Sequence, residues 1–166
     1  MVRKAKMSDL PQLLSLYSRA REFMKKTGNP DQWRDNYPPR ETVVDDIEKE
    51  QLYVVFDGDT LLGVFMFFLG PEPTYEKIEG VWGYDTPYGT IHRVASSGEG
   101  RGLFSRVLEF CLLKTPHIRI DTHADNLVMQ HTLEKHGFTR CGKIYLQNGD
   151  PRIAYELMKD GKNNET

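Results

Sequence analysis

The hydrophobic residues near the start of the chain recur every three or four positions, which is the spacing of one helix face. Ser8 can cap such a helix, Pro11 lies early enough that its missing N–H costs little, and Gly28 is a common terminating residue. The pattern predicts an amphipathic helix over residues 9–27 and a shorter helix over residues 41–50. The apolar face of the first helix consists of Leu10, Leu13, Leu14, Tyr17, Ala20 and Met24.

From residue 52 onward, short apolar runs between turn residues replace the helical spacing, and they predict strands. Residues 53–56 and 61–69 flank Asp57-Gly58-Asp59, where Asp and Gly tolerate a positive φ, so we expect a hairpin. The run over 61–69 is apolar almost throughout, as expected of a strand buried on both faces. A long loop then covers residues 70–89. The remaining pattern predicts strands over 90–96, 118–122, 138–146 and 152–158, helices over 102–114 and 126–136, and a short first strand over 2–5.

This order of elements predicts a protein of the α/β class, with a mixed sheet that carries helices on both faces. The 166 residues suit one domain, which we expect over residues 1–159, followed by a loose tail over residues 160–166. Hydrophobic residues make up 39% of the chain and charged residues 28%, which excludes a wholly disordered protein.

Charge and cysteine content narrow the possible partners. The chain has 22 Lys and Arg residues against 24 Asp and Glu residues, a net charge of −2, with no long basic run, so we expect neither a nucleic-acid partner nor a membrane partner. The apolar stretch over 61–69 is too short to span a bilayer, and the N-terminus lacks the apolar segment of a signal peptide. Cys111 and Cys141 form no disulfide framework and, like the histidines, lack metal-ligand spacing, which predicts a cytoplasmic protein with no metal site.

Three closely spaced glycines, Gly98, Gly100 and Gly102, lie between a predicted strand and a predicted helix. Glycines let successive backbone N–H groups point at one position, and the helix start adds free N–H groups and a positive dipole end. Such a corner suits a phosphate or diphosphate, with added charge from Arg101 and Arg106, or it is a tight turn that binds nothing. The motif is neither a nucleotide P-loop nor a dinucleotide fingerprint, because the lysine and the glycine spacing of those motifs are missing.

The glycine corner resembles the signature of the GNAT superfamily of N-acetyltransferases, Gln/Arg-x-x-Gly-x-Gly/Ala, which also lies between a strand and a helix. Gly100 and Gly102 match this pattern, whereas Glu99 and Phe104 depart from it. A second block, from Asn126 to Lys135-His136-Gly137-Phe138, is similar to the Asn…Lys-x-Gly-Phe stretch of the superfamily, and the element order agrees from residue 2 to about residue 158. The resemblance implies a mostly antiparallel, twisted sheet whose strands 90–96 and 118–122 splay apart.

The resemblance also implies acetyl-CoA as cosubstrate. Backbone amides of the glycine loop would hold its diphosphate, and residues 93–96 would pair with the pantetheine arm. A bulge in this strand would aim an N–H at the thioester carbonyl and stabilise the oxyanion by about 3 kcal/mol. Asn126 would lie near the cofactor arm, although Asn is also a favoured helix N-cap. The cofactor-binding residues expected on this basis are Val94, Ala95, Ser96, Gly98, Gly100, Arg101, Gly102, Leu103 and Asn126.

Direct transfer requires a base for the substrate ammonium and a proton for the departing thiolate. His92 and His123, near the ends of strands at the predicted cleft, are the candidate bases, and Asp121 could orient either one. Each histidine could instead have a structural or solvent-facing role.

For the acid, the resemblance points to a Tyr on the fourth helix. Leu133 occupies that position, so Tyr145, Cys141 and water are the remaining candidates. We expect His117 and His131 at the surface.

The acceptor would contact the proline-rich loop over residues 29–40, where Gln32, Trp33 and Tyr37 could line a pocket, or Trp33 could anchor the loop on the core. We predict an N-acetyltransferase that transfers acetyl from acetyl-CoA to the primary amine of a small molecule in a ternary complex. The alternatives are a non-catalytic acyl-CoA sensor domain and a protein N-terminal or lysine acetyltransferase. Monomer and homodimer are both compatible with the sequence.

Overall fold

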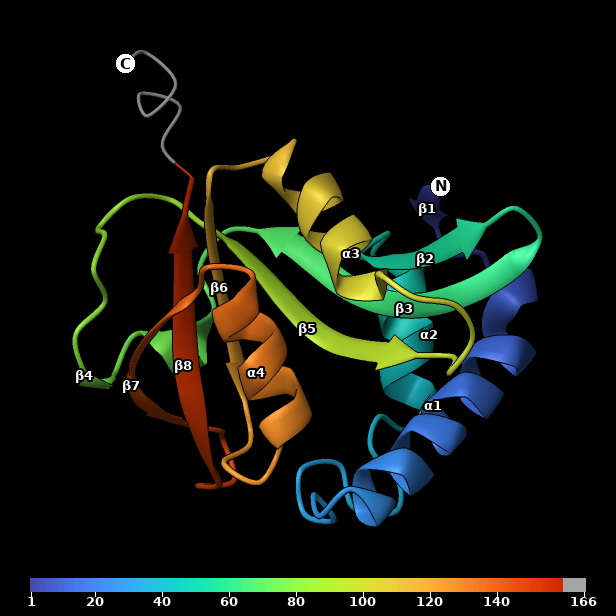
Figure 1. Ribbon diagram of the computed structural model, residues 1–166, viewed down its shortest axis with the longest axis horizontal. Helices are drawn as coiled ribbons and strands as arrows, with labels where there is room; N and C mark the ends of the chain where they lie inside the picture. Colours follow the sequence, from blue (N-terminus) through green and yellow to red (C-terminus); the bar gives the residue numbers. More distant parts are fainter. Residues whose placement is uncertain (160–166) are drawn as a thin grey trace.

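A computed structural model describes residues 1–159 of the protein (Figure 1). Its helices are α1 (Leu10–Lys26), α2 (Arg40–Glu48), α3 (Leu103–Leu112) and α4 (Leu127–Lys135), with 3-10 turns η1 (Met7–Asp9) and η2 (Pro73–Tyr75). Its strands are β1 (Val2–Lys4), β2 (Leu52–Asp57), β3 (Thr60–Leu69), β4 (Glu79–Gly80), β5 (Gly89–Ser96), β6 (His117–Thr122), β7 (Thr139–Tyr145) and β8 (Pro151–Met158). The predicted tail over 160–166 lies outside the described residues.

The described strands form one eight-stranded sheet in the order β1-β2-β3-β5-β6-β8-β7-β4. All neighbouring pairs are antiparallel except β5 and β6, which are parallel. The prediction of a mixed α/β sheet is therefore confirmed. The periodic patterns located every helix and long strand to within a few residues, because each buries an apolar face that its own sequence specifies.

Helices cover both faces of the sheet, as predicted. On one face, α1 and α2 pack on β2 and β3 through a core that includes Leu13, Leu16 and Val64. On the other face, α3 and α4 pack on the central strands through a core that includes Val107, Leu133 and Tyr155. Figure 1 shows α3 and α4 in front of the sheet, in yellow and orange. The interior of β3 is buried on both faces, which explains its almost uninterrupted apolar sequence.

The loop over residues 70–89 is anchored by its aromatic residues. Tyr75 is 1% exposed and packs with Ile144 and Ala154. The ring centroids of Trp82 and Tyr88 lie 4.1 and 4.2 Å from the guanidinium carbon of Arg119. The loop also contains the short strand β4, which the sequence pattern did not predict because two residues show no periodicity.

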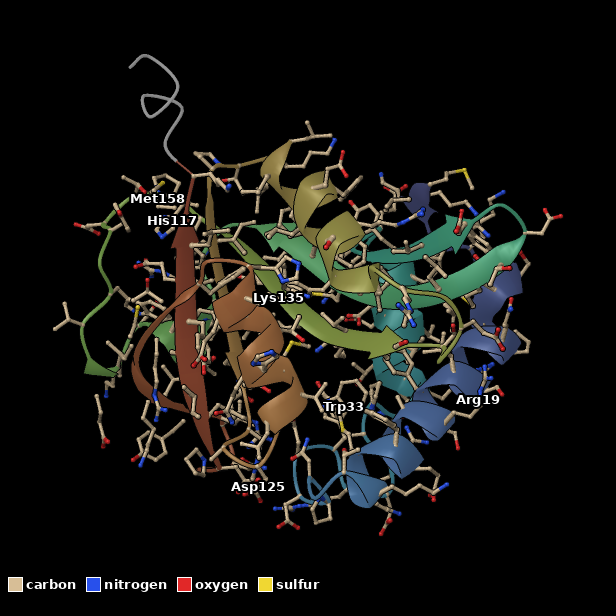
Figure 2. All side chains as sticks on the ribbon, in the orientation of Figure 1. Arg19, Trp33, His117, Asp125, Lys135 and Met158 are labelled. Carbon is tan, nitrogen blue, oxygen red and sulfur yellow. The ribbon has the colours of Figure 1, made fainter. Side chains whose placement is uncertain are left out.

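The prediction that His117 lies at the surface is wrong. Its side chain is fully buried, and its Nε2 lies 2.6 Å from Oε2 of Glu156 on β8. His117 and Met158, labelled in Figure 2, are paired residues of β6 and β8, and the loop 70–89 covers this end of the sheet. Within residues 1–159 no helix is long and apolar enough to cross a bilayer.

Strands β5 and β6 are paired at one end only. Their register contains Gly89 opposite Ile118 and Thr90 opposite Arg119, after which the two strands separate (Figure 1). The predicted splay of residues 90–96 and 118–122 is therefore confirmed. Beyond residue 90, the edge of β5 that faces β6 has no strand partner among the described residues, so its backbone is available to a ligand.

Strand β5 also contains a bulge at the point where it separates from β6. His92 pairs with Met66 and Ala95 pairs with Val64, so Arg93 and Val94 together face Phe65 alone. Arg93 has a φ of +52°, which lies in the left-handed region that residues other than glycine rarely adopt. The bulge therefore interrupts the regular ladder inside the predicted cofactor strand.

Candidate active site

A cavity of about 1140 Å³ opens where β5 and β6 separate. Its walls come from β5, the glycine corner, α4, the loop 29–40 and the start of β8. In the view of Figure 2, Trp33 lies between Arg19 of α1 and Asp125, which precedes α4. Residues that are far apart in the chain line this one cavity, which exists because β5 and β6 separate.

The glycine corner has an unsatisfied set of backbone donors at the mouth of this cavity. Gly98, Gly100 and Gly102 have φ values of +83°, +68° and +78°, which favour glycine. The hydroxyl oxygens of Ser96 and Ser97 accept the N–H groups of residues 98 and 99. In the described part of the chain, the N–H groups of residues 100–105 have no acceptor. A diphosphate fits this arrangement, because it would accept several of these N–H groups at the positive end of α3.

The two arginines expected to add charge to the corner do not line the cavity. Arg106 donates to the Phe56 carbonyl at 3.2 Å and lies 3.6 Å from Asp57, so its charge is directed toward β2. Arg101 is exposed, and neither it nor Gly100 is among the lining residues, whereas Gly98, Gly102 and Leu103 are. The free donors at the mouth of the cavity therefore come from the backbone of the corner rather than from its arginines.

The bulge in β5 is held from two sides. The Tyr17 hydroxyl donates to the carbonyl of Arg93 at 2.9 Å. The Arg93 guanidinium forms a bidentate pair with Asp46, at 2.7 and 2.8 Å, and donates to the Tyr37 hydroxyl at 2.9 Å. These bonds fix the strand conformation next to Val94, Ala95 and Ser96, which line the cavity as expected.

His92 lies beside two carboxylates and one tyrosine at the same cavity. Its Nε2 is 3.1 Å from Oε2 of Glu72, and its Nδ1 is 3.9 Å from Oδ2 of Asp121. The buried Tyr75 hydroxyl donates to the same Asp121 oxygen at 2.6 Å. Since the carboxylate of Glu72 accepts hydrogen bonds, it favours the Nε2–H tautomer of His92 and leaves Nδ1 free to accept a proton.

The electrostatics of this cluster keep Glu72 ionised and Tyr75 neutral. Burial alone would raise the pKa of the Glu72 carboxyl, but the hydrogen bonds from His92 and Thr74 outweigh it, and the pKa lies below its usual value. Burial, together with the charge of Asp121, raises the pKa of Tyr75 well above its ordinary value. Glu72 was missed by the sequence patterns, because a charged residue between two loop prolines carries no periodic signal.

The other two catalytic candidates lie away from the cavity. The Nδ1 atom of His123 accepts the backbone N–H of Asp125 at 3.0 Å, and His123 is not among the lining residues. Tyr145 is 42% exposed on β7, where its hydroxyl donates to Glu79 at 3.0 Å. Cys141, on the same strand, also does not line the cavity. Leu133, at the position of the usual tyrosine, is fully buried.

The loop 29–40 forms one wall of the cavity, and a hydrogen bond joins it to the start of α4 on the opposite wall. Trp33 is 7% exposed and packs edge-on against Tyr17, so it anchors the loop on the core, and it also lines the cavity. The Gln32 side-chain oxygen accepts from the amide of Asn126 at 2.8 Å. Asn126 in turn accepts the N–H of Met129, which makes it the N-cap of α4 as well as a cavity residue. Tyr37 also lines the cavity.

Arg152 is a buried cavity residue that sequence analysis did not identify. It is 6% exposed at the start of β8. Its guanidinium donates to the backbone carbonyls of Gln32, at 3.0 Å, and Pro151, at 2.8 Å. A single arginine in an alternating strand gives no signal by itself, because the sheet order decides what it faces.

A comparison with solved structures identifies the family. An acetyltransferase of the GNAT family from Streptococcus agalactiae 2603 is 35% identical to this chain, with a TM-score of 0.85, and the match covers 96% of this chain and 95% of that one. This chain belongs to the GNAT family of acetyltransferases. The resemblance drawn from Gly100, Gly102 and the second block is therefore confirmed.

Two further solved structures share the fold at lower similarity. A candidate acetyltransferase from Staphylococcus aureus Mu50 is 29% identical over 95% of this chain and 98% of that chain, with a TM-score of 0.69. The candidate acetyltransferase YncA of Salmonella typhimurium, solved with its cofactor acetyl-CoA, shares the fold at 15% identity and a TM-score of 0.61, over 97% of this chain and 94% of that one. No family model and no curated protein matched the chain.

Proposed function

We propose that this GNAT acetyltransferase transfers the acetyl group of acetyl-CoA to the primary amine of a small molecule, by direct attack in a ternary complex. The observation that carries the proposal is the run of N–H groups over residues 100–105 that have no acceptor within residues 1–159, at the mouth of the cavity that also contains His92. A diphosphate at one end and a base at the other are what a CoA-dependent transferase needs.

The donor half of the cavity supports acetyl-CoA. The glycine corner would hold the diphosphate, and the free edge of β5 beyond Thr90 would pair with the amides of the pantetheine arm. Acetyl-CoA supplies an acyl group activated as a thioester. An N–H at the Arg93–Val94 bulge, outside the regular ladder, would stabilise the oxyanion. The acetyl-CoA complex of the Salmonella protein with the same fold is consistent with this assignment.

The acceptor half of the cavity contains a residue that can remove the proton of the substrate ammonium. His92 would take the ammonium proton at Nδ1, directly or through water, and the ionised Glu72 at 3.1 Å would stabilise the resulting imidazolium. Because Leu133 replaces the usual tyrosine and Tyr145 lies elsewhere, water is the remaining candidate for protonating the thiolate.

Calorimetry with acetyl-CoA tests the donor site. Gly102→Val should weaken acetyl-CoA binding at least tenfold, because a side chain at this positive φ disturbs the N–H groups of the corner. Gly58→Val is the matched control, since Gly58 also has a positive φ with no neighbour within 4 Å but lies in the β2–β3 turn. Equal affinities for the two variants would remove the diphosphate assignment.

Thiol release across a panel of amines tests the reaction. Turnover on small primary amines supports the proposal. Acetyl-CoA binding without turnover on any amine would favour the sensor alternative, and turnover on peptides alone would favour a protein acetyltransferase.

A further inference from the structure

Arg152 is a buried charge that forms no salt bridge within residues 1–159. Among the described residues, Arg119 and Arg152 are buried, and the side chain of Arg93 is 13% exposed. Arg93 pairs with Asp46 and Arg119 with Glu156, whereas no carboxylate among residues 1–159 lies within salt-bridge distance of Arg152. A buried charge is costly unless it is paired, so an unpaired one suggests a ligand that supplies the partner.

The guanidinium of Arg152 is oriented but not saturated. One terminal nitrogen donates to the carbonyl of Pro151, and the other donates to the carbonyl of Gln32. The remaining N–H groups of the guanidinium have no acceptor in the described residues. Burial lowers the pKa of Arg152, and the charges of Asp121 and Asp150 only partly offset this effect. Since Arg152 lines the cavity, these free donors are accessible to a molecule bound there.

The carboxylate of Asp121 lies on the neighbouring strand β6. Asp121 pairs with Ala154 across β6 and β8, so Arg152, two residues before Ala154, is its diagonal neighbour on the same face of the sheet. Such residues lie about 7–8 Å apart. Asp121 and Glu72 both lie beside His92. One end of the acceptor pocket is therefore negative, and the other is positive.

We infer that the acceptor carries a carboxylate that binds the fork of Arg152 while its amine lies beside His92 and Asp121, as in an amino acid or a related amino carboxylate. The inference rests on the proposed function and names its substrate class. An ammonium matches the Asp121–Glu72 end, and a carboxylate matches the planar fork, which can bind it with two parallel hydrogen bonds. Because Asp121 and Arg152 are diagonal neighbours on adjacent strands, one small molecule can contact both residues.

Matched acceptors test the inference directly. The experiment measures kcat/KM for the L-amino acids and for the corresponding L-amino acid amides, which lack the carboxylate charge. The wild-type protein should prefer at least one acid over its amide by tenfold or more. Arg152→Met should reduce this acid-to-amide ratio at least tenfold, and Arg152→Lys should reduce it less, because lysine keeps the charge but not the fork.

Arg140→Met is the matched control, since Arg140 is exposed on β7 and does not line the cavity, and it should leave the ratio unchanged. Comparing ratios cancels the intrinsic difference in reactivity between acids and amides. An unchanged ratio in Arg152→Met would overturn the inference, and so would turnover on other amines with no amino carboxylate accepted, while the proposed function would stand.

Binding measurements distinguish a failure of the carboxylate inference from a failure of the proposed function. If no amine is acetylated at all, the proposed function fails, and calorimetry with N-acetyl-L-amino acids and their amides decides whether Arg152 binds carboxylates. Tighter binding of the acids by the wild type, lost in Arg152→Met, would support the carboxylate site. Equal binding of acids and amides would overturn it.

Discussion

The two walls of the cavity each carry an arginine that is largely withdrawn from solvent, and the two arginines differ in their partners. On the β5 wall, Arg93 forms a bidentate pair with Asp46, and Tyr17 holds its carbonyl. On the β8 wall, Arg152 donates only to backbone carbonyls. An arginine with its counter-charge in the fold stabilises the fold, whereas one without it is available to a ligand. Variants of the two walls should therefore have different effects on stability and on activity.

The largest loss of stability should come from the β5 wall. Asp46→Ala leaves the largely buried Arg93 guanidinium without its carboxylate partner, and breaking a pair of this kind costs about 3–5 kcal/mol of unfolding free energy. Denaturant titration measures the loss. Asp45→Ala is the matched control, because the neighbouring Asp45 forms an exposed pair with Lys49 and should change stability little. Similar losses in both variants would contradict the role of the Arg93–Asp46 pair.

His92→Gln should lower kcat by about 100-fold, since it removes the proposed base from the same wall while amide and imidazole have similar size. His123→Gln should retain turnover, because His123 does not line the cavity. Initial rates with saturating acetyl-CoA measure both. Retained activity in His92→Gln together with its loss in His123→Gln would reverse the assignment.

A smaller effect is expected from the hydroxyl that holds the bulge. Tyr17→Phe removes the hydrogen bond to the Arg93 carbonyl and should cost about 1–2 kcal/mol of unfolding free energy. Tyr155→Phe is the control, since Tyr155 is also buried but its hydroxyl has no partner in the described residues. Thermal and denaturant unfolding should separate the two, and an equal cost would show that the bond contributes nothing.

The smallest change in stability is expected at Arg152. Arg152→Met removes a buried charge that has no carboxylate partner and keeps much of the side-chain volume. Its unfolding free energy should stay within about 1 kcal/mol of the wild-type value or rise. Denaturant titration checks this. A loss as large as that of Asp46→Ala would mean that the two arginines serve the same structural purpose.

The elements around the cavity were predictable because their signals are local. The spacing of Leu13 and Leu16 predicts α1, and the apolar run over residues 61–69 predicts β3. Gly100 and Gly102 identify the corner between β5 and α3. The family resemblance added the splay of β5 and β6 and a bulge in β5, which the strand registers confirm.

The partners of single polar residues were not predictable. His117 was expected at the surface but is buried, and the candidate catalytic residues His123 and Tyr145 do not line the cavity. The same holds for Arg101 and Arg106 of the glycine corner. Glu72 and Arg152 were missed, although both lie in the candidate site. Each outcome depends on a contact across many residues of sequence, such as His117 with Glu156 or Arg152 with Gln32.

The sequence by itself determined the elements, their order, the GNAT resemblance and the corner that suits a diphosphate, because periodicity and glycine content act over a few neighbouring residues. Only the tertiary structure decided which charges meet. The order β6-β8-β7 brings Arg152 diagonal to Asp121, and the folding of the loop 70–89 brings Glu72 to His92. Electrostatic partnership depends on distance in space and on burial, and neither is encoded in the spacing of residues along the chain.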